Sequence, residues 1–168
     1  ALLGLINGLL ITGFNLPPIV VTLGTMSAYR GAIFLFSKGA WINDQDIHPA
    51  IKGLPRLTFL GLPGLVWFAI VTLLLCWWFF SYRRAGREMY AIGGNLSAAA
   101  YIGIPIKRRL LQVYTMSGAL AGLAGLLWVG RYSIAFTELA AGFELTVIAS
   151  CVIGGVSTAG GIGNVMGA

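Results

Sequence analysis

The strongest constraint on the fold is an uncharged run from Pro63 to Tyr82 that is followed directly by Arg83 and Arg84. An α-helix rises about 1.5 Å per residue, so a helix of this length covers the roughly 30 Å hydrocarbon core of a bilayer. A second uncharged run, Leu110 to Gly130, begins directly after the basic residues 107–109. Both runs predict helices that cross a membrane.

Composition supports a membrane protein, because 58% of the residues are hydrophobic and only 10% are charged. A soluble domain uses about a quarter of its residues as charged ones. Disordered chains, disulfide-rich scaffolds and coiled coils need other compositions and are excluded. The net charge of +6 does not indicate nucleic-acid binding, because the basic residues cluster at the ends of apolar runs.

The charge distribution predicts the sidedness of the loops. Segment 83–109 carries six basic residues and one acid, Glu88, so the positive-inside rule makes it cytoplasmic. Segment 37–62 is then external. A third crossing is expected at 17–36, where Pro17 and Pro18 begin a helix because prolines are tolerated in the first turn.

Both ends of the chain are apolar without forming a full, regular span. Residues 1–11 are too few to cross, and residues 145–168 are uncharged but rich in glycine. We therefore expect partial or broken spans there. The predicted fold is an all-α polytopic transmembrane bundle with broken or re-entrant helices, and we interpret the chain as a fragment of a larger protein.

Small residues recur at four-residue spacing in the span that begins at Leu110. In lipid, such a face lets two helix backbones approach closely, so we predict a tight helix interface. The residues concerned are Gly118, Ala121, Gly122 and Gly125.

The segment 154–163 holds two adjacent glycine pairs, each of which disfavours a continuous helix. We expect the helix to break there. Irregular backbone at membrane depth must be buried by protein or line a watery cavity, so the segment is either part of a translocation pathway or an ordinary interfacial loop. The candidate pathway residues are Ser150, Gly154, Gly155, Ser157, Gly160 and Gly161.

The chain offers little for catalysis or cofactor binding. One histidine and five acids give no nucleophilic triad, paired carboxylates or metal cluster, so no enzyme, cofactor or metal site is expected. A phosphate loop is excluded because Gly161 stands where that motif needs lysine. Any ATP hydrolysis must therefore belong to another subunit.

The predicted cytoplasmic loop contains a candidate docking helix. Asn95 is suited to cap a short helix over 96–101, which Gly103 and Pro105 would end. Such a helix either binds a soluble partner or rests on lipid headgroups. The candidate coupling residues are Gly93, Gly94, Asn95, Ala98, Ala99 and Gly103.

Several motifs resemble those of the permease subunits of ribose-type ATP-binding cassette sugar importers, within the branched-chain amino acid and ribose permease superfamily, and they occur in the order found in that family. The chain resembles the middle of such a subunit and departs from the family pattern at Ala100, Thr146 and Ile162, where members often carry Arg, Asp and Arg. The motifs are Pro17 to Thr25, Tyr29-Arg30-Gly31, Gly86 to Asn95, Ser117 to Gly125, and Gly142 to Leu145 running into Ile153-Gly154-Gly155.

The resemblance implies a multi-pass protein of the inner membrane in which residues 1–168 form a partial permease domain. It implies transport of ribose, xylose, rhamnose, autoinducer-2 or a similar neutral solute. The implied partners are a cytoplasmic ATPase, a second permease subunit, an external solute-binding protein and membrane lipid. The segment 93–103 resembles the region that docks on the ATPase.

A secondary transporter or passive channel is the alternative function. Ion coupling usually needs an acid or base inside the membrane, and neither 63–82 nor 110–130 contains one. Association with an ATPase distinguishes the two functions.

Overall fold

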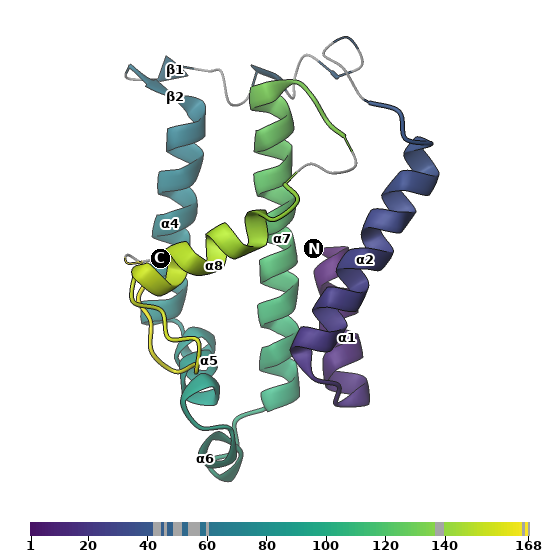
Figure 1. Cartoon of the computed structure of the whole chain (residues 1–168). Coiled ribbons are helices and arrows are strands. Elements are labelled where there is room, and N and C mark those ends of the chain that lie inside the picture. The colour runs from purple at the N-terminus through teal and green to yellow at the C-terminus, as the bar shows by residue number, and fades with distance from the viewer. Residues whose placement is uncertain are drawn as a thin grey trace. The chain divides into compact units, whose positions relative to one another are not determined.

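The computed structural model describes residues 1–41, 45, 47–48, 52–53, 58–59, 61–136, 140–165 and 167. Much of the predicted external loop 37–62 therefore lies outside the described residues. Over the described residues the chain is mainly helical (Figure 1), which confirms the all-α class. It divides into two compact units, Ala1–Phe68 with Leu111–Leu139, and Ala69–Leu110 with Ala140–Ala168.

Among the described residues, three helices are long and apolar enough to cross a membrane: α2 (Pro18–Ser37), α4 (Gly64–Tyr82) and α7 (Ile106–Tyr132). They fall where the sequence predicts crossings at 17–36, 63–82 and 110–130. The α7 helix has 27 residues, which makes it about 40 Å long. It therefore exceeds the hydrocarbon thickness, and its basic first turn can lie outside the membrane core.

Two shorter apolar helices complete the set, α1 (Leu2–Phe14) and α8 (Phe143–Ile153). In the first unit α1 packs on α2. The Tyr29 hydroxyl of α2 donates a hydrogen bond of 2.9 Å to the side-chain oxygen of Asn7 in α1. A two-stranded antiparallel pair, β1 (Thr58–Phe59) with β2 (Leu62–Pro63), precedes α4.

Local residue chemistry explains where these helices begin and end. Pro17 is the N-cap of α2 and Pro18 its first residue, as predicted, because a proline there loses no intrahelical hydrogen bond. The α1 helix stops at Asn15, whose φ of 53° is left-handed, a conformation that asparagine tolerates better than most residues. The α8 helix stops at Gly154, so the predicted break in the glycine-rich segment is confirmed.

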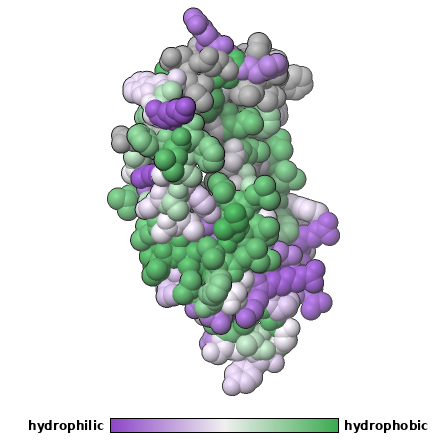
Figure 2. All heavy atoms as spheres, turned by 90° about the vertical axis from the view of Figure 1, so that its right-hand side faces the viewer, coloured by the Kyte–Doolittle hydropathy of each residue, from purple (hydrophilic) through white to green (hydrophobic). Residues whose placement is uncertain are grey.

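The apolar helices, long and short, expose much of their apolar surface. Phe36 is 90% exposed, Ile19 72% and Leu145 71%. On the face drawn in Figure 2, hydrophobic side chains form broad patches that are separate from the hydrophilic groups. Apolar exposure on this scale needs a cover of lipid or protein, as a multi-pass membrane protein has.

Two further helices connect α4 to α7 in the second unit, α5 (Arg84–Gly94) and α6 (Leu96–Tyr101). The α6 helix is the short helix that the sequence predicts. The α5 helix is not among the helices that the sequence predicts, because its residues fall in the predicted cytoplasmic loop 83–109. Gly93 and Gly94 are its last two residues.

Candidate functional site

Both ends of α6 are closed by local hydrogen bonds. The side-chain oxygen of Asn95 accepts a 2.9 Å bond from the backbone N–H of Ala98, which makes it the predicted N-cap. At the other end Gly103 has a φ of 78°. Its N–H and that of the next residue donate to the carbonyl oxygens of Ala100 and Ala99, which is a Schellman motif. The helix is thus well defined despite its length, while its docking role stays a prediction.

Ala99 differs in exposure from the rest of α6. It is only 2% exposed and packs inside the chain. In contrast, Tyr101 is 92% exposed, the C-cap residue Ile102 74% and Leu96 56%. We call these three exposed residues the apolar surface of α6. Ala98 is also exposed. A partner could therefore reach the apolar surface and Ala98, but not the side chain of Ala99.

Residues 154–165, which we call the pathway segment, follow α8 as a series of turns. The Ser157 N–H donates to the carbonyl oxygen of Ile162 at 2.9 Å, and the Gly160 N–H donates to that of Ser157 at 3.1 Å. Gly155, Gly160 and Gly161 have φ angles of 86°, 91° and 74°, which residues with a Cβ adopt only with strain. On α8, the Ser150 hydroxyl donates to the carbonyl oxygen of Thr146 at 2.8 Å.

Glycines of the pathway segment lie against the two glycines that end α5. A Cβ built on Gly93 would lie 2.8 Å from the nitrogen of Gly161. A Cβ on Gly160 would lie 2.6 Å from the carbonyl oxygen of Gly93, and one on Gly161 would collide with the Cα of Gly94. In Figure 1 the segment accordingly runs alongside α5. Within the second unit, the structure thus brings predicted coupling residues against predicted pathway residues.

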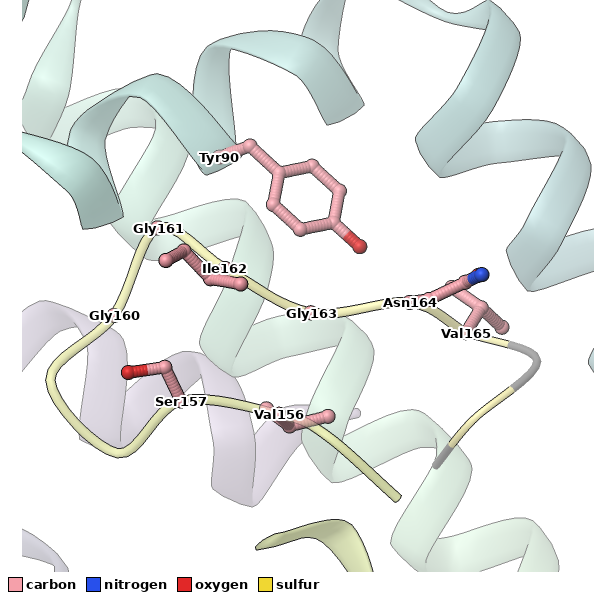
Figure 3. Close-up of a pocket in the computed structure, with 9 residues that line it drawn as sticks. All are labelled: Tyr90, Val156, Ser157, Gly160, Gly161, Ile162, Gly163, Asn164 and Val165. Carbon is pink, nitrogen blue, oxygen red and sulfur yellow. The ribbon is translucent and has the colours of Figure 1, made fainter.

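A shallow pocket of about 230 Å³ lies beside this contact. Tyr90 of α5 lines one side of it, and the pathway segment supplies the remaining lining residues, which include Ser157 and Asn164 (Figure 3). The lining has no charged side chain, but it includes a phenol, a hydroxyl and an amide. These groups can exchange hydrogen bonds with a neutral polar molecule. No group of three metal-binding side chains occurs among the described residues.

Glu88, on the buried side of α5, ties that helix to the first turns of α7. Its residue exposure is 8%. One carboxylate oxygen accepts a 2.6 Å bond from Arg109 Nε, and the other accepts a 2.7 Å bond from Arg84 Nε. These hydrogen bonds hold the pKa of Glu88 below its ordinary value, and the bond from Arg109 has the larger effect. The Arg109 side chain is 16% exposed and that of Arg84 is 86% exposed, so the Arg109 bond is the better shielded from solvent.

Sequence reasoning missed the role of Glu88 and the lining role of Tyr90. The available signal for Glu88 was its position as the single acid among six bases in segment 83–109. No comparable signal marked Tyr90, because its position beside the pathway segment depends on a contact between distant parts of the chain.

The predicted packing glycines have different surroundings. A Cβ on Gly118 would lie 2.7 Å from the Cα of Gly4, so α7 and α1 approach closely there within the first unit. A Cβ on Gly122 or Gly125 would meet no atom of the described residues within 4 Å. Ala121 is exposed. The second half of this small-residue face is therefore open as far as the described part of the chain is concerned.

The whole chain, residues 1–168, matches the family model described as "Branched-chain amino acid transport system / permease component". It is 38% identical over its full length to the autoinducer 2 import system permease protein LsrC of Klebsiella pneumoniae, of which it covers 48%. It is 37% identical over its full length to the protein of the same name from Enterobacter sp. strain 638, again covering 48%.

The protein of this name from Salmonella typhimurium is 35% identical over 98% of the chain, which covers 47% of it. The chain thus spans about half the length of the curated relatives it matches. No solved structure matches it. Because the family model extends over every residue, the chain belongs to the family of permease components of branched-chain amino acid transport systems.

Proposed function

We propose that this chain is part of the permease subunit of an ATP-binding cassette importer that carries a neutral, sugar-like solute across the inner membrane. Relatives at 35–38% identity are named as permeases of an autoinducer 2 import system. Autoinducer-2 is accordingly the first solute to test, and ribose, xylose and rhamnose are the next.

The apolar surface of α6, made by Leu96, Tyr101 and Ile102, is the observation that carries this proposal. It lies outside the three helices that are long enough to cross a membrane, and α6 is capped at both ends. Exposed aromatic and aliphatic side chains on a fixed helix are typical of the anchors that fill a partner's pocket. A cytoplasmic ATPase is the partner that this surface would bind.

The chemistry of the pathway segment supports a neutral solute. Residues 145–168 contain no charged side chain, so an ionic solute would find no counter-charge there. The nearby hydroxyl, phenol and amide groups of Ser157, Tyr90 and Asn164 suit a polyhydroxylated molecule. We propose that this pocket lies at the cytoplasmic end of the solute pathway.

The remaining partners follow from the same proposal. ATP hydrolysis takes place in a separate subunit, because this sequence has no phosphate loop. A second permease subunit, identical or homologous, completes the pathway and covers the open glycine face around Gly122. An external solute-binding protein delivers the solute.

The test is to replace Tyr101 with Asp in the full-length permease and to measure capture of the co-expressed ATPase. Loss of a central aromatic anchor costs about 2 kcal/mol or more, so we expect at least about tenfold weaker capture and a matching loss of uptake. The matched control is Trp41→Asp, which changes an exposed aromatic residue in the predicted external loop. That variant should retain capture of the ATPase.

Unchanged capture by the Tyr101 variant would place the docking surface elsewhere. If the unmodified permease captured no ATPase at all, the importer proposal itself would fail and a secondary transporter would be favoured.

A further inference from the structure

The α5 helix is fixed to its surroundings at both ends. Near its start, Glu88 is bonded to Arg109 at 2.6 Å. At its end, the backbone of Gly93 meets those of Gly160 and Gly161. Only Asn95 separates α5 from α6. A displacement of α6 therefore acts directly on a helix that already contacts the pathway segment.

The glycine contact is suited to passing on a displacement. Two backbones meet there without intervening side chains, so no rotamer change can absorb a shift. A Cβ at Gly93 would lie 2.8 Å from a backbone nitrogen, which is closer than packed atoms allow, so the pathway segment would have to move. Closely packed interfaces of this kind change between discrete arrangements and deform little within each one.

The Glu88 bond holds the first half of α5 against the first turn of α7. It joins the two helices through a carboxylate that is 8% exposed. Breaking a shielded ion pair costs far more than losing an exposed one. A displacement of α5 would therefore be resisted at Glu88 and reach the pathway segment at Gly93.

We propose that α5 is the connector that carries movement of α6 to the pathway segment, with Gly93 and Glu88 as its positioning residues. This inference rests on the proposed function, because it assumes an ATPase that moves α6. Tyr90 lies on α5 between the two positioning residues and lines the pocket against the pathway segment (Figure 3). Movement of α5 thus changes the pocket. Closure of the ATPase would shift the population between the arrangements of α5 against the pathway segment.

The first test replaces Gly93 with Ala in the full-length permease, assembled with its ATPase and solute-binding protein. The matched control is Gly24→Ala, since Gly24 is also a helical glycine but an added Cβ there meets nothing within 4 Å. We measure ATPase capture, ATP hydrolysis and autoinducer-2 uptake. The Gly93 variant should take up at least about tenfold less autoinducer-2 per ATP hydrolysed than the Gly24 control.

The second test uses the other end of α5 and covers the case in which the Gly93 variant does not fold. Arg109→Gln removes the better shielded of the two charged partners of Glu88. Arg108→Gln is the matched control, because Arg108 is the exposed neighbour of Arg109. The Arg109 variant should capture the ATPase but take up several-fold less autoinducer-2 per ATP hydrolysed. Combining it with Glu88→Gln should cost little more, because both changes break the same link.

The outcomes separate the connector from the proposed function. Uptake per ATP equal to that of the controls in the Arg109 variant, or in a folded Gly93 variant, would overturn the connector while the importer stands. Absence of ATPase capture or of ATP-dependent uptake in the unmodified complex would overturn both.

Discussion

At the residue scale, Asn95 and Glu88 are the two polar side chains that hold α5 and α6 in place. The Asn95 side chain accepts a 2.9 Å hydrogen bond from the N–H of Ala98, three residues further on, and so caps α6. The bond between Glu88 and Arg109 joins residues 21 positions apart. Charge pattern alone does not show which of several arginines a carboxylate reaches.

The Glu88 bonds make a prediction about acid sensitivity. The hydrogen bonds from Arg109 and Arg84 lower the pKa of Glu88 from 4.5. Because the pKa of Glu88 is lower in the folded than in the unfolded protein, the link contributes its full stability at pH values above the pKa of the unfolded state. This stability is lost as the pH falls through the pKa of the folded state, which lies below 4.5. Hydrogen exchange of the α5 amides, corrected for the intrinsic pH dependence, should show constant protection down to about pH 5 and falling protection below it.

The control for this measurement is Glu88→Gln, which has no carboxylate to protonate. Near neutral pH, the α5 amides of this variant should be less protected than those of the unmodified protein. On acidification below about pH 5, their protection should not fall further. An equal acid-induced loss in both proteins would assign the effect to other carboxylates.

At the scale of elements, the helices long enough to cross were predictable because an uncharged run of sufficient length has few alternatives in a membrane. The break after Ile153 was predictable because paired glycines disfavour a helix. The α5 helix was not, since its two terminal glycines match a loop pattern equally well. In the structure α5 packs closely against the end of α4, where a Cβ on Gly86 would lie 2.6 Å from the carbonyl oxygen of Phe79.

The small-residue face of α7 gives a prediction that separates contacts within the chain from contacts between chains. Gly118→Leu places a large side chain where even a Cβ lies 2.7 Å from Gly4, so the yield of folded protein should fall sharply. Gly122→Leu should leave that yield near normal, because an added Cβ meets nothing within 4 Å. It should instead weaken association with the second permease subunit.

Detergent-stable yield and co-purification of two differently tagged permease copies measure these two effects. Equal yields for the Gly118 and Gly122 variants would contradict the assignment of Gly118 to a contact within the chain. Unchanged association in the Gly122 variant would show that its face meets lipid.

At the scale of the whole molecule, composition was sufficient to predict the class, because 58% hydrophobic residues leave few soluble alternatives. Family membership could be expected from motifs spread along the chain, and the family model matches all of its residues. The contact of Gly93 with Gly160 and Gly161 could not be predicted, because nothing in the sequence indicates which distant residues a glycine contacts. This contact relates the predicted coupling residues to the predicted pathway.

The most direct test of the importer is autoinducer-2 uptake by proteoliposomes that contain the full-length permease, with or without its ATPase, and receive the solute-binding protein outside. The account predicts uptake only when the ATPase is present and hydrolysable ATP is enclosed on its side of the membrane. A non-hydrolysable analogue should abolish uptake. Uptake by the permease alone, driven by an ion gradient without nucleotide, would contradict the account.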